Sequence, residues 1–335
     1  MTQQKGIVKA NLPWENSRAG FSISAFLHRL GTLSKLSVNN LKYYDSHPNP
    51  ASDYSEAVQR IEAKITSEVD FYEGSHSFLL THGAKAAKVI IFTHGWASSP
   101  APFTEIAGEF YNRGYNVLVM TMPYCGLADR MNTEQAKMRA EDFVRYGDEV
   151  VDIARGLGEH ITMAGISAGG LVTAWVAQQR QDVDLAVLIS PGLGIKAIPR
   201  FWTPFMSWAL RVIPNWYIWE DPEKKENAPR PYNYVRMPSR VVGQILRLAL
   251  AVKALARQKA PSAGSIVVIT NLNDPGIDNV AVDNVADLWR ERRPTGVQTY
   301  KFPAELGLGH DIIDVKDPQM NVELVYPKLF ELIDQ

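Results

Sequence analysis

The stretch MAGISAGGLV, from Met163 to Val172, places one serine among three glycines and two alanines. It follows the β-branched run HITMA (His160–Ala164) and precedes LVTAWVAQQ (Leu171–Gln179), whose composition favours a helix. The order strand, G-x-S-x-G, helix is typical of a sharp turn that presents a serine oxygen at the end of a strand. A glycine-rich turn with an incidental serine is the alternative, and other positions in the chain decide between the two.

Short β-branched runs alternate with longer helical stretches from about Phe71 onward. The runs expected to form strands are Lys88–Phe92, Tyr115–Met120, His160–Ala164, Asp184–Ser190, Ser265–Thr270 and Val297–Phe302. Nearly continuous apolar strands are buried on both faces, as in a parallel sheet, and most spacers are long enough for crossover helices. The expected fold class is therefore α/β, with a doubly wound, mostly parallel sheet.

The interval between the fourth and fifth expected strands is longer than seventy residues, far beyond a single crossover helix. It contains four of the eight tryptophans, and its prolines exclude one long helix before an amphipathic stretch at about Val241–Gln258. Residues 194–262 are therefore expected to form a helical cap, inserted into a core made of residues 71–193 and 263–335.

Residues 1–70 precede the alternating pattern and are expected to form an N-terminal extension that lies on the body of the protein. Its one predicted helix covers Ala51–Glu68, where apolar residues recur at helical spacing. Either Ser52 or Asp53 is expected to cap the start of this helix.

Composition excludes several classes of protein. The 335 residues are 46% hydrophobic, which is ample for a large core, and a net charge of -1 leaves no basic surplus for nucleic acid. The single cysteine, Cys125, excludes an internal disulfide and a cysteine-based metal site. No apolar run approaches membrane-spanning length, and Met1–Leu12 do not resemble a secretory leader. We therefore expect a soluble cytoplasmic protein.

A serine nucleophile needs a general base and an acid that follow it in the order serine, acid, histidine. Of the seven histidines, only His310 lies downstream of the serine, in the glycine-flanked loop ELGLGHDIID. An acid is expected after the penultimate strand, where both Asp274 and Asp278 are available. Asp274 is preferred because it lies nearer the strand end, although Asp-Pro-Gly is also an ordinary turn sequence.

The loop THGWASSP (Thr93–Pro100) follows the first expected strand and can supply part of an oxyanion hole. Two fixed backbone N–H groups stabilise the charge of an acyl-transfer intermediate by several kcal/mol. The predicted donors are the N–H groups of Ala168, directly after the serine, and of Trp96. His94 is expected to brace this loop rather than to transfer protons.

Five segments carry a resemblance to a known family: Phe92–Phe103, Met122–Arg130, Gly165–Gly170, Asn271–Asn279 and Leu306–Asp314. From about Ser77 to the C-terminus the chain resembles the α/β-hydrolase fold, and more narrowly the bacterial serine hydrolases grouped with monoacylglycerol lipases and serine aminopeptidases. The resemblance implies a nucleophile at Ser167, an acid at Asp274, a base at His310, and an oxyanion hole at Trp96 and Ala168.

Two positions depart from the pattern of that family. Relatives often have a histidine in a P-x-H-G element where this chain has Cys125. A small packed side chain is expected there rather than a reactive thiol. The residue after His94-Gly95 is the bulky Trp96, which argues against long acyl chains.

The expected activity is that of a carboxylesterase that cleaves short or medium acyl esters without a cofactor or a metal. The stretch Pro191–Ala197 imitates a dinucleotide fingerprint, but Pro199 follows at once and breaks the helix that such a site needs. The expected partner is a small-molecule ester, with no nucleic acid and no membrane span; a homodimer stays open.

Three alternatives remain at this stage. The first two are a monoacylglycerol lipase and an amidase or aminopeptidase, and the third is a non-catalytic ligand-binding protein on the same fold. An aminopeptidase needs acidic residues near the site, for which the candidates in the cap are Glu220, Asp221, Glu223 and Glu226. The aromatic residues of the cap are expected either to wall an acyl pocket or, for the most part, to attach the cap to the sheet domain: Trp202, Phe205, Trp208, Trp216, Tyr217 and Trp219.

Overall fold

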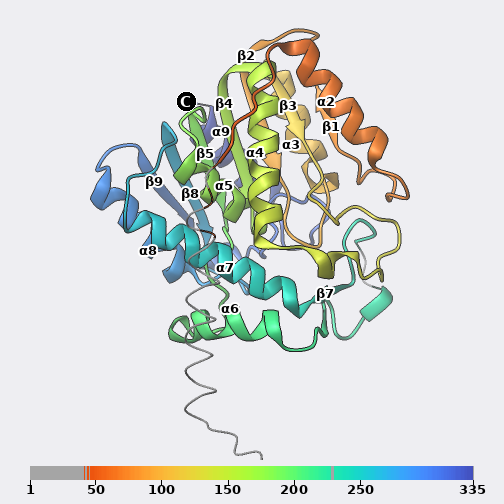
Figure 1. The fold of residues 1–335 in the computed structure, drawn as a ribbon, viewed down its shortest axis with the longest axis vertical. Helices are drawn as coiled ribbons and strands as arrows, with labels where there is room; N and C mark the ends of the chain where they lie inside the picture. Colours follow the sequence, from red (N-terminus) through yellow and green to blue (C-terminus); the bar gives the residue numbers. More distant parts are fainter. Residues whose placement is uncertain (1–40, 42–43, 45, 228–229, 335) are drawn as a thin grey trace, which may run out of the picture.

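The computed structural model describes residues 41, 44, 46–227 and 230–334, so most of the expected N-terminal extension lies outside the described residues. Within them the chain forms a seven-stranded sheet flanked by helices (Figure 1). Its strands are β1 (Phe78–Leu80), β2 (Ala86–Thr93), β3 (Tyr115–Val119), β4 (Gly158–Ile166), β5 (Leu185–Ile189), β8 (Ser265–Asn271) and β9 (Val297–Phe302). The spatial order is β1-β3-β2-β4-β5-β8-β9. Only the β1–β3 pair in this sheet is antiparallel, which confirms the expected mostly parallel α/β sheet.

Helices cover both faces of the sheet. They are α2 (Tyr54–Ser67), α3 (Thr104–Asn112), α4 (Ala140–Leu157), α5 (Ala168–Gln179), α6 (Thr203–Val212), α7 (Ser239–Ala256), α8 (Asn279–Arg292) and α9 (Val322–Ile333). In β2, Val89 and Ile91 join the core shared with α2, α4, α5, α7 and α8. Ile90 and Phe92 join the core shared with α3 and α9. A strand that is apolar at consecutive positions is thus buried on both faces, and the sheet is doubly wound.

The helix after the G-x-S-x-G stretch has no polar face. Every residue of α5 from Ala168 to Gln178 is buried. A helix that is apolar all round has to be covered on all sides, and α4, α7 and the sheet pack around this one. The turn before α5 therefore stands on a rigid element.

Two strands differ from the sequence-based expectation. β9 is an edge strand in which only Phe302 is fully buried, so the expectation of burial on both faces is wrong for it. Its polar residues Gln298 and Lys301 are exposed, as is common for charged and polar side chains on an edge strand. The antiparallel strand β1 was not expected, since three residues are too short to show a hydrophobic period.

The predicted helix near the N-terminus is confirmed as α2, and the structure decides between its two candidate caps. The side chain of Asp53 accepts a hydrogen bond of 2.9 Å from the backbone N–H of Glu56. The hydroxyl of Ser52 instead donates to the carboxylate of Glu56. Asp53 is therefore the N-cap, with Ser52 on the outer side of the same turn.

The insertion between β5 and β8, residues 194–262, contains α6, α7 and a two-stranded sheet of β6 (Tyr217–Trp219) and β7 (Arg236–Pro238). Figure 1 shows α7 running across the molecule with α6 on its outer side. The two helices approach closely at Gly243, where a Cβ would lie 2.9 Å from the side chain of Arg211. The treatment of this insertion as a separate cap domain stays a prediction.

The aromatic residues of the insertion do not all pack as expected. Trp202, Phe205 and Trp216 are 47%, 46% and 45% exposed, so they do not attach the insertion to the sheet domain. Trp202 instead packs edge to face on Phe205, with ring centroids 5.3 Å apart. The expectation that most of these rings fix the insertion to the core is wrong for these three, because Trp202 lies in the turn before α6, Phe205 on α6 and Trp216 after it, each with nearly half of its surface exposed.

Candidate active site

The chemistry-bearing residues follow parallel strands of one sheet. Ser167 comes directly after β4, Asp274 follows β8, and His310 lies in the loop beyond β9. The loop with His94 and Trp96 follows β2, which pairs with β4. Because the carboxyl ends of parallel strands meet at the same edge of a sheet, these four segments share one edge.

Ser167 has a backbone conformation that side chains rarely adopt. Its φ of 57° and ψ of −117° lie outside the helical and strand regions, directly before the first turn of α5. The turn is held by two hydrogen bonds, from the Ser167 N–H to the Ile189 carbonyl at 3.0 Å and from the Gly192 N–H to the Ser167 carbonyl at 2.8 Å. Strain of this kind is typical of functional residues, and it favours a purpose-built turn over an incidental serine.

The glycines on either side of the serine are required by close packing. A Cβ at Gly165 would lie 2.2 Å from the hydroxyl oxygen of Thr93. A Cβ at Gly169 would lie 2.2 Å from the carbonyl oxygen of the same threonine. Both positions abut the end of β2, so any larger residue would force the turn away from the neighbouring strand. The structure thus gives a steric reason for the G-x-S-x-G spacing.

His310 and Asp274 are in direct contact. His310 Nδ1 lies 2.8 Å from Asp274 Oδ2, and the carboxylate of Asp274 is fully buried. Its other oxygen accepts hydrogen bonds from the N–H groups of Gly276 and Ile277, at 2.8 and 3.0 Å. With Nδ1 engaged, the free ring nitrogen of His310 is Nε2.

Burial and pairing act in opposite directions on the pKa values of this pair. Burial raises the pKa of Asp274, but the hydrogen bond and charge of His310 and the two backbone N–H groups outweigh it, so the pKa is lowered. Burial lowers the pKa of His310, but the bond to Asp274 outweighs it and the pKa is raised. The pair thus favours an ionised carboxylate beside a basic imidazole.

Asp278, the other acid candidate, has a structural role. Asp278 is the N-cap of α8, where its carboxylate accepts a hydrogen bond of 3.1 Å from the Val280 N–H. It also lies 3.5 Å from the guanidinium of Arg200. Of the two candidates, the structure brings Asp274 to the histidine.

Asn271 is a supporting residue that the sequence analysis missed. Its buried side-chain amide donates to the carbonyls of Leu308 and Gly309, both at 2.7 Å, and so ties the histidine loop to the end of β8. Asn273 donates to Leu308 as well, at 3.2 Å. The sequence signal that could have pointed to Asn271 is the pair of asparagines in NLND, at the end of β8, the strand that pairs with β9.

His94 fixes the orientation of the peptide that carries the Trp96 N–H. Its Nε2 accepts a hydrogen bond of 2.9 Å from the Met122 N–H, and burial lowers its pKa to about 4. The neutral ring therefore carries its proton on Nδ1 and donates it to the Gly95 carbonyl at 2.8 Å. Since C=O and N–H point in opposite directions across a trans peptide, the Trp96 N–H is directed away from this ring. The expected bracing role of His94 is confirmed.

The loop with His94 lies against the serine, because a Cβ at Gly95 would be 3.5 Å from the Ser167 Cβ. In the described part of the chain, the backbone N–H groups of Trp96 and Ala168 donate no hydrogen bond. The first N–H groups of a helix have no partner within it, which explains why the N–H of Ala168, the first residue of α5, is unpaired. Two unused donors therefore occur on the segments that flank Ser167.

The Ser167 hydroxyl makes no hydrogen bond within the described residues. In this structure the hydroxyl therefore makes no hydrogen bond with His310, and hydrogen bonds of this kind can tighten when a substrate binds. What the structure brings together is the acid with the histidine, and the histidine loop with the end of β8, which is separated from β4 by β5.

Cys125 is buried and unreactive. Its side chain has no exposed surface, and burial raises the pKa of its thiol to about 12. The side-chain amide of Gln135 donates to Sγ over 3.9 Å. The expectation of a packed side chain rather than a reactive thiol is confirmed, since a thiolate is the reactive form.

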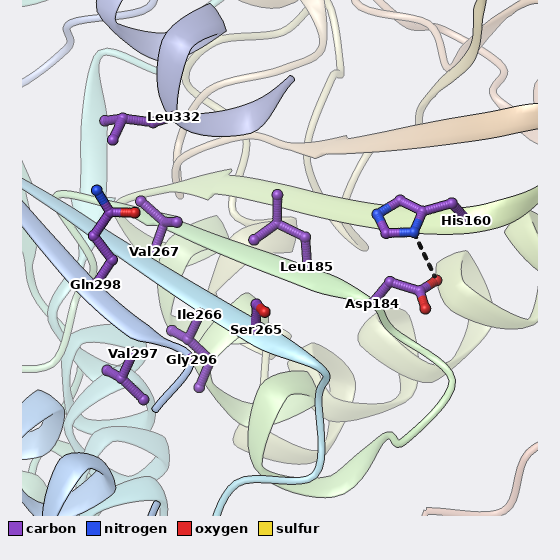
Figure 2. Close-up of a pocket in the computed structure, with 10 residues that line it drawn as sticks. All are labelled: His160, Asp184, Leu185, Ser265, Ile266, Val267, Gly296, Val297, Gln298 and Leu332. Atoms are coloured by element: carbon purple, nitrogen blue, oxygen red, sulfur yellow. Dashed lines mark ion pairs between the residues drawn. The ribbon is translucent and has the colours of Figure 1, made fainter. Parts of the chain in front are cut away.

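A cavity of about 360 Å³ lies at the opposite, amino-terminal edge of the sheet and also contains a serine, a histidine and an aspartate (Figure 2). His160 points toward Asp184, but Nδ1 and Oδ2 are 3.7 Å apart and both side chains are nearly half exposed. Ser265 is the first residue of β8, without the strained turn of Ser167. This cavity therefore lacks the arrangement found at the carboxyl edge.

Two absences among the described residues concern metals and membranes. No group of three or more histidine, cysteine, aspartate or glutamate side chains there has an arrangement that could hold a metal ion. None of the helices described is both long and apolar enough to cross a bilayer.

Comparisons with known proteins concern the family and the fold of this chain. Residues 84–245 match the family model for serine aminopeptidase, S33. Comparison with curated protein sequences gives no match. One of the metagenome-derived lipolytic enzymes LipS and LipT superposes with a TM-score of 0.58 at 16% identity, covering 79% of this chain and 99% of that one.

Two further solved structures are similar. The monoacylglycerol lipase of Paleococcus ferrophilus has a TM-score of 0.57 and 15% identity, over 77% of this chain and 98% of that one. A soluble variant of the Saccharomyces cerevisiae monoglyceride lipase has a TM-score of 0.57 and 12% identity, over 77% and 90%. At these identities the similarity shows the fold. The chain therefore has the α/β-hydrolase fold, and just under half of it, residues 84–245, is similar to the serine aminopeptidase S33 family.

Proposed function

We propose that this chain is a serine carboxylesterase that cleaves esters of short or medium acyl chains through an acyl-enzyme on Ser167. The observation that carries the proposal is the 2.8 Å contact between His310 Nδ1 and Asp274 Oδ2, at the same sheet edge as the strained Ser167. A glycine-rich turn with an incidental serine would not require such a pair, and neither would an ordinary surface loop.

In the acylation step, the Ser167 hydroxyl oxygen attacks the ester carbonyl carbon while His310 Nε2 takes its proton. Asp274 holds the ring through Nδ1 and stabilises the imidazolium that forms. The negative charge on the former carbonyl oxygen is stabilised by the N–H groups of Trp96 and Ala168. When the intermediate collapses, His310 returns the proton to the leaving alcohol.

In the deacylation step, His310 takes a proton from water, and the hydroxide formed attacks the acyl carbon. The second tetrahedral intermediate places its charge on the same two N–H groups. Its collapse releases the carboxylic acid, and the proton on His310 returns to the Ser167 oxygen. The cycle uses only groups of this chain.

Glu220 bears on the choice between an ester and a peptide with a free N-terminus. Its carboxylate is paired with Arg230 at 2.8 Å, so its charge is already compensated. Asp221 is likewise engaged, with the N–H groups of Glu223 and Lys224. The charges of Glu220 and Asp221 are thus compensated within the insertion, although one buried oxygen of Glu220 accepts no hydrogen bond and the other two acidic candidates, Glu223 and Glu226, are exposed. The pairing of Glu220 and Asp221 favours an ester over an aminopeptidase substrate. The bulk of Trp96 beside the serine favours a short or medium acyl group.

The test is a substrate panel together with covalent labelling. We expect turnover of p-nitrophenyl esters that is highest for short or medium acyl groups, less with monoacylglycerols, and least with aminoacyl anilides. A fluorophosphonate should label one site per chain, located at Ser167 by mass spectrometry of the peptides. If the protein neither turns over esters nor takes up the label, the non-catalytic ligand-binding alternative holds instead.

The pH dependence of kcat/KM follows from the state of His310. The base must be neutral to accept a proton, and Asp274 raises its pKa above the ordinary 6.5. We expect kcat/KM to rise with pH and to reach half of its maximum above pH 6.5. The rate–pH profile measured with a neutral p-nitrophenyl ester checks this. A rise that is already complete at pH 6.5 would contradict the assigned base.

A further inference from the structure

One arginine of the insertion lies among four carboxylates. They belong to Glu220, Asp311, Asp314 and Asp317, and the last three closely follow His310 in the sequence. Arg230 Nη2 is 2.8 Å from Glu220, and Nη1 lies 3.4 Å from Asp311 and 3.2 Å from Asp317. The arginine side chain is only 23% exposed, so these pairs are screened less than pairs on an open surface.

The residues after Arg230 contact both loops of the candidate site. The hydroxyl of Tyr232 donates to Asp314 at 2.5 Å, which adds a second tie to the histidine loop. The N–H of Tyr234 donates to the carbonyl of Ala97 at 2.8 Å, in the loop that carries the Trp96 N–H. One short stretch of the insertion therefore joins the histidine loop to the loop that carries the Trp96 N–H.

This stretch is itself anchored to the core. Arg130, which lies between β3 and α4, donates from Nη2 to the carbonyl of Arg230 at 2.9 Å. Its Nε donates to the carbonyl of Asn233 at 2.8 Å. The backbone on both sides of Tyr232 is thus held by Arg130, and so is the residue that carries the Arg230 side chain toward the histidine loop.

We propose that Arg230 is a positioning residue for His310, through which the insertion sets the place and charge environment of the base. The proposal rests on the function proposed above, because it assigns a role in the same site. Without Arg230, three aspartates of one short loop would face each other uncompensated, and their repulsion would move the loop that carries His310.

The charged groups around His310 allow this proposal to be tested through the pKa of that histidine. The groups that act on it are Asp274 after β8, Asp311 in its own loop, and Arg230 of the insertion. Both carboxylates favour the protonated imidazole, while Arg230 opposes it. Replacement of Arg230 by a neutral residue should therefore raise the pKa of His310 further, an effect that general damage to the insertion would not produce.

The experiment compares Arg230→Gln, Arg230→Lys and a matched control, Arg236→Gln. Arg236 belongs to the same insertion and binds the Met131 carbonyl and the Tyr217 ring, away from the histidine loop. We expect Arg230→Gln to lower kcat about 10- to 100-fold with a smaller change in KM, because the loop moves His310 Nε2 relative to Ser167 while Nδ1 keeps its contact with Asp274. Arg230→Lys should restore part of this loss, and Arg236→Gln should keep the wild-type pH profile.

The titration of the His310 ring by NMR, assigned with His310→Gln, provides a readout that does not depend on turnover. An upward shift in Arg230→Gln, absent in Arg236→Gln, supports the proposal. An unchanged titration, or an equal shift in both variants, overturns it. If the wild type neither turns over esters nor takes up fluorophosphonate, the proposed function fails, while the titration still shows whether Arg230 acts on His310.

Discussion

Ser167→Ala should lower kcat/KM for the preferred ester by about 10⁴- to 10⁶-fold and abolish labelling by a fluorophosphonate. The reason is that the substitution removes the oxygen that we propose forms the acyl bond, while the N–H groups of Trp96 and Ala168 stay in place. The fold should be retained, since the Ser167 hydroxyl makes no hydrogen bond within the described residues. Circular dichroism and thermal unfolding check the fold, and steady-state kinetics with burst measurements check the chemistry.

Ser190→Ala is the matched control for that variant. Ser190 follows β5, also has a positive φ, of 39°, and is fully buried, so its oxygen cannot reach a substrate. We expect Ser190→Ala to keep most of the turnover. Full activity in Ser167→Ala would require another nucleophile, and an equal loss in both variants would show a structural effect rather than a chemical one.

Asp274→Asn should lower kcat by about 10⁴-fold, the second of the two largest effects expected. The amide preserves the shape of the carboxylate, but an NH₂ group directed at His310 Nδ1 requires the other tautomer of the ring. The proton then sits on Nε2, where it blocks acceptance of the serine proton. The amide also carries no charge to stabilise the imidazolium.

Asp278→Asn tests whether the loss of kcat is specific to Asp274. Asparagine caps helices about as well as aspartate, so the α8 cap should survive and turnover should change little. The comparison needs kcat and KM for both variants, with thermal unfolding as the check on α8. If Asp278→Asn loses more activity than Asp274→Asn, the acid has been assigned to the wrong position.

The sequence predicts the strands best where burial leaves the clearest pattern. β2, β3, β4, β5 and β8 are apolar at consecutive positions because they lie inside the sheet with helices on both faces. β9 contains the polar residues Gln298, Thr299 and Lys301 among apolar ones, which is typical of a partly exposed strand at the edge of a sheet. The exposed rings of Trp202 and Phe205 could not be foreseen, since aromatic residues are usually buried.

The candidate site was predicted from chain order and local motifs, and its supporting contacts were not. Ser167, Asp274 and His310 each follow a recognisable strand, so their order along the chain suffices to propose them. Asn271 and Arg230 act through contacts with residues that lie far along the chain and have no local motif. Such contacts depend on tertiary packing, which a single sequence does not display.

The buried thiol of Cys125 makes this protein convenient for site-directed labelling. The chain has no other cysteine, and maleimides and iodoacetamides react with exposed thiolates. Phe201→Cys, at a position that is 78% exposed beside α6, would therefore introduce the one thiol open to such a reagent. A fluorophore there would report movement of the insertion without first removing the native cysteine.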